Sequence, residues 1–316
     1  MGDESKISEL TKELAALKAK TKPPHSLKVL DSWISHTENI LDQKYHNRIA
    51  WLIATTIVTA KLQQVTESND SCRFILKGGT LLQHRLKTTT RATKDLDGIV
   101  RGDIDDFLEL LDDELEIPWG PIDFKRSDIE TIGTPAKIIK PRRFTISLLL
   151  GGQVWRKVKI EVSPDEGAAG TAQEEFPAPP LDGFGLPTPD RLIGLAMSYQ
   201  IAQKIHTASD PHDPPEFKNE RARDVIDLLL LKDFTEEAGS PTMQEINEAI
   251  ADIFKSRGAE AGVLGRSVRT WPTAIEPHPH WQADYDAAAK AVGVSLSLGE
   301  AVTEVNAWLK VMGKTQ

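Results

Sequence analysis

Two aspartates separated by one residue, Asp95 and Asp97, lie in a segment of alternating polar and apolar side chains at 95–100. The alternation predicts a strand, and in a strand residues i and i+2 point to the same face. Both carboxylates can then bind a pair of divalent cations that hold the attacking and leaving oxygens of a phosphoryl or nucleotidyl transfer. Because such a pair also occurs by chance on exposed strands, its meaning depends on the residues around it.

A glycine-rich turn precedes the two aspartates. Residues 74–76 predict a short buried strand and residues 81–86 predict a helix, so the turn joins a strand to a helix. Glycines at such a turn let backbone N–H groups approach a phosphate, whose charge the helix N-terminus favours. Taken alone, the same residues are explained by an ordinary turn. The turn consists of Lys77, Gly78, Gly79 and Thr80.

A third carboxylate lies in the predicted strand 154–162. Alternation places Glu161 and Lys159 on one face of this strand and Ile160 on the core face. If the strand lies beside that of the aspartates, Glu161 becomes a third metal ligand or the base that accepts a proton from the attacking hydroxyl. The alternative is an exposed glutamate paired with a basic residue across the sheet.

Acidic residues also enter an apolar helix further along the chain. In the predicted helix 221–232, Asp224 and Asp227 share one face. An ion pair between Arg223 and Asp227 within the helix is the simplest explanation. However, the four leucines at 228–231 predict that the helix is buried, and a charge in an apolar helix usually has a partner.

Helical periodicity dominates both ends of the sequence. Apolar residues recur every three or four positions there, between charged residues and proline breaks. The predicted helices span residues 4–20, 26–42, 46–65, 188–206, 221–232, 243–256 and 298–312.

Between these helical regions the sequence predicts a small mixed α/β module. It contains the strands and turn described above, a helix over 105–115, and a hairpin of strands at 143–150 and 154–162 joined by a Gly-Gly turn. Residues 164–189, rich in Gly, Ala and Pro, predict an irregular linker. The predicted parts are N-terminal helices at 1–68, a core at 69–165, a linker at 166–187 and a helical C-terminal lobe at 188–316.

Composition limits the classes of protein to which the chain can belong. Its 316 residues include one cysteine, Cys72, which excludes an intrachain disulfide and predicts a buried or incidental thiol. The longest apolar stretch, 50–60, is too short to cross a bilayer, and the N-terminus has no signal-peptide pattern. These features predict a cytoplasmic protein with no membrane partner.

The charge pattern bears on nucleic-acid binding. A formal net charge of −9 argues against nonspecific coating of nucleic acid, which needs many basic residues. Nine Lys and Arg nevertheless fall within 125–159, and they form either an RNA-facing surface or a solvated sheet surface. The acidic run at 103–114 predicts a solvated helix face. His278 and His280, with no third ligand at zinc spacing, predict surface loop residues, and the tryptophans predict helix packing.

Taken together, the motifs resemble the AbiEii/AbiGii toxin family, the nucleotidyltransferase-like toxins of type IV toxin–antitoxin and abortive-infection systems. The resemblance covers about residues 45 to 235, with the motifs in the same order. The residues that carry it are 74–82, Arg91-x-Thr93-Lys94-Asp95-Leu96-Asp97, Gln203-Lys204-Ile205-His206 and Arg221-x-Arg223-Asp224-x-x-Asp227-Leu228.

The resemblance implies an α+β, bilobed fold: a polymerase-beta-like nucleotidyltransferase lobe, with a mixed sheet and flanking helices, plus a helical C-terminal lobe. It also implies that the glycine turn holds the triphosphate and that the two aspartates bind Mg²⁺ or Mn²⁺. Lys204 would contact a nucleotide phosphate, and Asp224 would be an orienting or catalytic acidic group. The implied catalytic set is Asp95, Asp97, Glu161, Lys204 and Asp224, with Asp95, Asp97 and Glu161 as metal ligands. The implied nucleotide-binding set is Lys77, Gly78, Gly79, Thr80, Lys204 and Arg221.

Such an enzyme would move a nucleoside monophosphate from an NTP to an RNA hydroxyl, with tRNA as the expected acceptor. A cognate antitoxin is the expected protein partner. Two other functions fit part of the sequence. A nucleotide-binding module could act through partner binding without turnover. A nucleotide-sugar transferase would use the Asp-x-Asp pair but leaves the glycine turn and the Arg-x-Arg-Asp helix unexplained.

Overall fold

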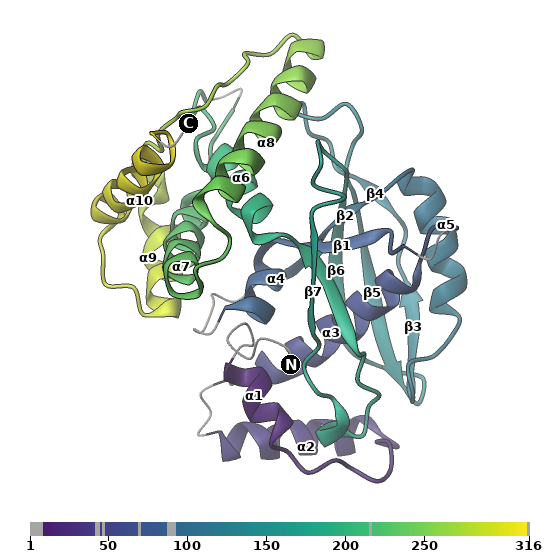
Figure 1. Cartoon of the computed structure of the whole chain (residues 1–316). Helices are drawn as coiled ribbons and strands as arrows, with labels where there is room; N and C mark the ends of the chain where they lie inside the picture. The colour runs from purple at the N-terminus through teal and green to yellow at the C-terminus, as the bar shows by residue number, and fades with distance from the viewer. Residues whose placement is uncertain are drawn as a thin grey trace.

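The computed structural model describes residues 9–41, 45, 48–68, 71–86, 93–214 and 217–314. Arg91 and the start of the predicted helix 4–20 lie outside the described residues. The chain forms an α+β fold, in which one mixed sheet is accompanied by three groups of helices (Figure 1).

The sheet contains eight strands in the order β3-β5-β6-β2-β1-β8-β7, with β4 paired to β5. Most neighbours are antiparallel, but β2 pairs parallel with β6, and β1 pairs parallel with β8. The strands are β1 (Phe74–Lys77), β2 (Asp95–Val100), β3 (Ile122–Arg126), β4 (Glu130–Thr131), β5 (Arg142–Leu150), β6 (Gln153–Pro164), β7 (Gln173–Pro177) and β8 (Arg191–Leu195).

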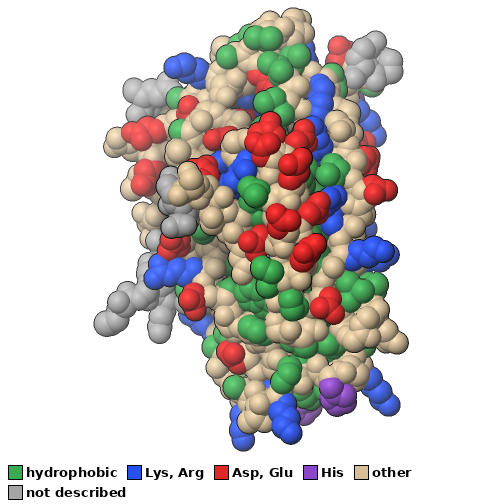
Figure 2. Space-filling view, turned by 90° about the vertical axis from the view of Figure 1, so that its right-hand side faces the viewer, with side chains coloured by type: hydrophobic (Ala, Val, Ile, Leu, Met, Phe, Trp, Pro, Cys, Tyr) green, Lys and Arg blue, Asp and Glu red, His purple; other side chains and the backbone are tan. Residues whose placement is uncertain are grey.

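Two long helices, α3 (Arg48–Gln64) and α5 (Ile104–Leu115), pack on the sheet and on each other. Thirteen residues of α3 are buried, which agrees with its nearly uniform apolar sequence. In α5 only one face is buried, and the side chain of Asp103 caps its N-terminus by accepting from the N–H groups of Asp105 and Asp106. The opposite face of α5 is acidic, as predicted, and acidic side chains gather on that side of the molecule (Figure 2).

Three further helices belong to the N-terminal part of the chain. Helices α1 (Glu9–Ala15) and α2 (Leu27–Ile40) lie below the sheet, where α2 contacts α3 and the 3-10 turn η2 (Asp182–Phe184) (Figure 1). The short helix α4 (Gly78–Arg85) leads out of β1 and packs on β1 and β2. No helix in the described part of the chain is long and apolar enough to span a membrane.

The C-terminal helices gather on the other side of the sheet from α5 (Figure 1). Helix α6 lies between α7 and α8 and makes its most extensive helix contacts with α8. Capping boxes begin α8 at Thr242 and α10 at Ser297. These elements are α6 (Met197–Ala208), α7 (Ala222–Ala238), α8 (Met243–Val263), η3 (Pro279–Trp281), α9 (Gln282–Val292) and α10 (Leu298–Met312).

The structure differs from the sequence prediction most clearly in residues 164–195. The predicted helix 188–206 begins only at Met197, and the residues before it form β8. Much of the predicted irregular linker forms β7 and η2. The reason is tertiary: β8 fills the position between β1 and β7, and the side chain of Gln63 bonds both backbone groups of Ile193. The division into four parts stays a prediction.

Candidate active site

Four adjacent strands place charged residues in one row across the sheet. Asp97 on β2 is in register with Lys77 on β1 and with Glu161 on β6. Glu161 is in turn in register with Arg143 on β5. The strand of Glu161 therefore lies beside that of the aspartates, as the hypothesis of a third carboxylate requires.

The glycine turn lies directly against Asp97. Gly78 has φ +71°, a conformation that glycine adopts without strain, and a Cβ atom added there would overlap the Asp97 carboxylate. Gln200 of α6 holds the turn: its Nε2 donates to the Gly78 carbonyl and its Oε1 accepts from the Gly78 N–H, both at 3.2 Å. Thr80 is fully buried and donates its hydroxyl to the Asp95 carbonyl at 3.0 Å. Thr80 thus ties the turn to β2.

Basic residues of the sheet pair with two of the three carboxylates. Lys159 Nζ lies 2.8 Å from Asp95 Oδ1, and Arg143 lies 2.8 Å from Glu161 Oε1. The alternative assigned to Glu161, pairing with a basic residue across the sheet, therefore describes its contact in this structure. The same contact keeps Glu161 next to Asp97.

The surroundings of Asp97 disfavour the negative charge of its ionised carboxylate. Burial raises the pKa of its carboxyl, and the neighbouring carboxylates of Glu161 and Asp95 raise it further, against the opposing effects of Lys77 and Lys204. Lys77 donates to Ser163 Oγ at 2.6 Å, and burial lowers the pKa of its ammonium group. Added positive charge near Asp97 would counter this effect.

Helices α6 and α7 bring a buried lysine between two aspartates. Lys204 Nζ lies 2.8 Å from Asp224 Oδ1 and 2.7 Å from Asp227 Oδ2, and all three side chains are at most 10% exposed. Thr207 also donates to Asp224, at 3.1 Å. The interpretation of Arg223 and Asp227 as a pair within the helix is wrong, because Asp227 is bound by Lys204 from the neighbouring helix. The expected buried partner exists.

Arg221, the last of the predicted nucleotide-binding residues, immediately precedes α7. Its backbone N–H donates to Asn219 Oδ1 at 3.0 Å, and its side chain is exposed. It lies outside the row of strand residues.

The family is now decided by comparison. The sequence model of a family described as nucleotidyl transferase AbiEii toxin, type IV toxin–antitoxin system, matches residues 61–310. The chain belongs to this family. The resemblance drawn from the motifs is confirmed, and the match continues well beyond residue 235, where that resemblance ended.

The AbiEii toxin is therefore a nucleotidyltransferase. It is also similar in structure to MenT4, a nucleotidyltransferase toxin from Mycobacterium tuberculosis H37Rv. The identity is 16% over 83% of this chain and 93% of that chain, with a TM-score of 0.41. No curated protein matches the sequence.

The donor set of the toxin suits a hard divalent cation, which prefers carboxylate oxygens. Asp95 and Asp97 lie two residues apart on β2 and therefore point to the same face of the sheet. The negative electrostatic potential from the carboxylates around Asp97 favours a cation there. Within the described residues, however, no three acidic, histidine or cysteine side chains converge as a metal site. Lys159 would have to release Asp95, and Arg143 would have to release Glu161. A metal held by Asp97 and Asp95 would therefore displace Lys159, and one held also by Glu161 would displace Arg143 as well.

Sequence reasoning missed several residues that organise this site. Gln200 lies one helical turn before Lys204 on α6, and that spacing was the available signal. Glu166 accepts from Lys137, Gln203 and Arg257. Although burial raises it, Arg257 and Lys137 hold the pKa of Glu166 well below its usual range. No local pattern marks Glu166, because its partners come from three distant segments.

The basic stretch proposed as an RNA surface is largely paired within the toxin. Lys137 bridges Glu166 and Glu260, and Arg142 contacts Asp105. Lys140 donates to two backbone carbonyls. These contacts favour the alternative of a sheet surface.

The other sequence signals have structural roles. Cys72 is buried, and burial raises the pKa of its thiol to about 11. His278 lies in the loop before η3 and His280 lies within η3, and the ring centroid of His212 lies 4.4 Å from that of His280. Trp281 and Trp308 are buried packing residues, as expected.

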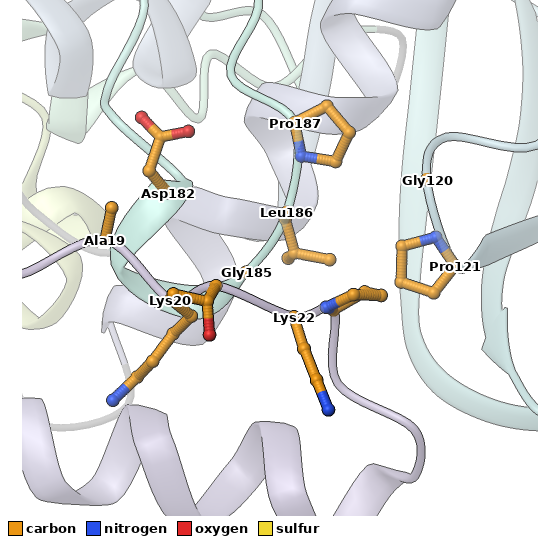
Figure 3. Close-up of a pocket in the computed structure, with 11 residues that line it drawn as sticks. Ala19, Lys20, Lys22, Gly120, Pro121, Asp182, Gly185, Leu186 and Pro187 are labelled. Atoms are coloured by element: carbon orange, nitrogen blue, oxygen red, sulfur yellow. The ribbon is translucent and has the colours of Figure 1, made fainter.

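A hollow of about 480 Å³ lies away from all of these residues, between the segments 19–23, 120–121 and 182–187 (Figure 3). Its lining consists mainly of proline, glycine and other small or apolar residues, with Lys20, Lys22 and Asp182 as its charged members. It contains none of the candidate site residues and is not part of the active site.

Proposed function

We propose that this toxin transfers a nucleoside monophosphate from an NTP to an RNA hydroxyl, with tRNA as the acceptor and pyrophosphate as the leaving group. The observation that carries the proposal is the register of Lys77, Asp97 and Glu161 beside the glycine turn. This arrangement combines a phosphate-binding turn, a carboxylate pair and a third carboxylate on one surface. A nucleotide-sugar transferase would use the carboxylate pair but leaves the glycine turn and the Arg-x-Arg-Asp helix unexplained.

Asp95 and Asp97 would hold the divalent cation, which would supply charge neutralisation and alignment for in-line attack on the α-phosphorus. The first turn of α4 directs backbone N–H groups toward the triphosphate, and Gln200 fixes the turn that presents them. Because Gln200 occupies the Gly78 N–H, Gly79 and the next residues are the donors available to phosphate.

Lys204 would contact a phosphate of the bound nucleotide. Asp224 and Asp227 hold its ammonium group in place, so Asp224 acts through Lys204 as a positioning residue. Glu161 would accept the proton of the attacking hydroxyl once Arg143 has moved from it. Arg143 then takes part in activation by releasing or holding this base.

Blocking an RNA end in this way would stop translation, which fits the toxin assignment of the family, and an antitoxin would then be the expected partner. The proposal is tested by incubating the protein with each of the four α-labelled NTPs, Mg²⁺ and total RNA, and separating RNA from protein on a gel. Label in a tRNA-sized band supports it. Label confined to protein would contradict the acceptor, and NTP binding without any transfer would favour the binding-module alternative.

A further inference from the structure

Four arginines surround one carboxylate at the end of α6. Arg269 forms an ion pair with Asp210 and donates to the His206 carbonyl at 2.6 Å. Arg257 of α8 approaches His206 Nδ1 at 3.1 Å, while Arg266 lies 6.0 Å from the centre of the Phe217 ring. We call Arg221, Arg257, Arg266 and Arg269 the arginine cluster.

The arginine cluster carries more positive charge than its surroundings balance. All four arginines lower the pKa of Asp210, although burial raises it more strongly. Burial lowers the pKa of Arg269, Asp210 opposes this shift, and Arg257 and Arg266 lower the pKa further. Burial, Arg257 and Arg269 together lower the pKa of His206 to about 2, so its ring is neutral. An anionic ligand would relieve this repulsion.

A groove of about 410 Å³ adjoins the arginine cluster. Its floor is apolar and aromatic, with Phe254 and Trp271, and its rim carries Lys255 and Arg269. Along the described segment 255–271 there are four basic residues and one acidic residue, in a chain with a net charge of −9. No ion pair is formed by Lys255 or Arg266 with any described carboxylate, in contrast to the paired stretch 137–143.

The arginine cluster and the candidate active site share the elements α6 and α7. His206 follows Lys204 by two residues, and Arg221 precedes Asp224 by three. Arg257 joins the two regions directly, because it binds Glu166 next to Lys77. Unstacked bases bind to aromatic side chains, and phosphates bind to unpaired basic groups.

We propose that the groove and the exposed edge of the arginine cluster bind single-stranded acceptor RNA, with phosphates on Lys255 and Arg266, a phosphate replacing Asp210 on Arg269, and a base against Trp271. This rests on the proposed function for its substrate class. It places the RNA surface on α8 and the segment that follows α8, away from the stretch 137–143.

The test compares a double variant on the proposed RNA surface with a double variant away from it. Lys255→Ala with Arg266→Ala removes two exposed cations of the surface. Lys290→Ala with Lys310→Ala removes two exposed cations on α9 and α10 and is the matched control. Binding of a fluorescent single-stranded tRNA 3′-end oligonucleotide is measured without NTP, over a salt titration, alongside NTP binding.

The first pair should weaken RNA binding roughly tenfold at low salt and reduce the salt slope by about 1.4 units, because each single-strand phosphate contact accounts for about 0.7. The control pair should change neither quantity, and NTP affinity should stay constant in both. Asp210→Asn should strengthen RNA binding, because it removes the carboxylate that competes with phosphate for Arg269.

Equal slopes for wild type and the Lys255/Arg266 pair would overturn the inference, as would weaker RNA binding by a folded Asp210→Asn protein. Because binding is read without turnover, this result is separate from the proposed function. If label is transferred to RNA but the variants do not change RNA binding, the proposed function is supported and the RNA surface proposed here is contradicted. If RNA binding responds to the variants as expected but no label is transferred, the RNA surface is supported and the proposed transfer is contradicted.

Discussion

At the scale of single residues, Asp97 is the carboxylate that lies among the other charged residues of the site. It lies between Lys77 and Glu161 across the sheet, and Asp95 is two residues away on the same strand. Its raised pKa reflects burial among carboxylates, which costs stability when no cation is bound. A residue that is unfavourable for folding and central to a site is typical of a functional carboxylate.

Replacing Asp97 by Asn should separate these two roles. We expect transfer to fall by on the order of a thousandfold or more, because a metal ligand contributes several kcal/mol in the transition state. In chelator the variant should melt at or above the wild-type temperature, since it lacks the buried charge. Mg²⁺ should raise the melting temperature of wild type only. A folded variant with full activity would rule out the metal role of Asp97.

Lys204 gives a second prediction at this scale. Lys204→Ala leaves Asp224 and Asp227 buried without their shared cation, so the free energy of unfolding should fall by about 3–5 kcal/mol. Nucleotide affinity should also fall, by about 1.5–3 kcal/mol for one charge-assisted phosphate contact. Denaturant unfolding and calorimetry with NTP measure the two effects. The triple variant Lys204→Ala, Asp224→Asn, Asp227→Asn is the control, since it should recover stability without recovering NTP binding.

Unchanged NTP affinity in a folded Lys204→Ala protein would remove Lys204 from the nucleotide site. Its pairing with the two aspartates would then be purely structural.

At the scale of elements, α6 connects the glycine turn to the helical side of the molecule. One face of this helix carries Gln200, Gln203, Lys204 and Thr207, and each contacts a different part of the site. The contact between Gln200 and Gly78 spans 122 positions of sequence. Such a contact cannot be inferred from local pattern, which is why Gln200 escaped sequence analysis although Lys204 did not.

Gln200→Ala should therefore loosen the turn without unfolding α6. We expect the KM for NTP to rise roughly tenfold, for the loss of about 1–1.5 kcal/mol of hydrogen bonding to the turn, with a smaller change in kcat. Gln200→Glu should be worse, because it cannot donate to the Gly78 carbonyl and it adds negative charge near Asp97. Steady-state kinetics with varied NTP measure this. Equal loss of activity in both variants with unchanged KM would indicate a merely structural role.

The elements that the sequence predicted well are those with a strong internal pattern. The hairpin of β5 and β6 alternates along most of its length around its Gly-Gly turn, with one irregularity at Leu148 and Leu149, and α5 has one apolar face. Strand β8 was mistaken for the start of a helix because the residues before it resemble a helix N-terminus. Its conformation is set by pairing with β1 and β7, so only tertiary structure reveals it.

At the scale of the whole molecule, the site is assembled from both the sheet and the C-terminal helices. The sequence supplied the carboxylates, the turn and Lys204 through their types and order. It offered a basic partner across the sheet for Glu161, but it did not identify that partner as Arg143 or predict the pair of Lys159 with Asp95, because strand register decides both. Those pairs suggest that the site changes its contacts when metal and nucleotide bind.

The distribution of charge over the molecule also bears on the partner. Acidic residues of α5 cover one side (Figure 2), while the arginine cluster belongs to α8 and to the segments that precede α7 and follow α8. A polyanion is therefore expected to approach from the helical side. This asymmetry would allow a chain with a net charge of −9 to bind the proposed RNA acceptor.

The central claim, nucleotidyl transfer at Asp95 and Asp97, is tested most directly by comparing NTP labelled at the α-phosphate with NTP labelled at the γ-phosphate. The protein is incubated with Mg²⁺ and RNA, with Asp97→Asn and chelator as controls. The account predicts that α-label enters RNA, that γ-label is released as pyrophosphate, and that both controls abolish transfer. Incorporation of γ-label, or α-label transfer that persists in Asp97→Asn, would contradict it.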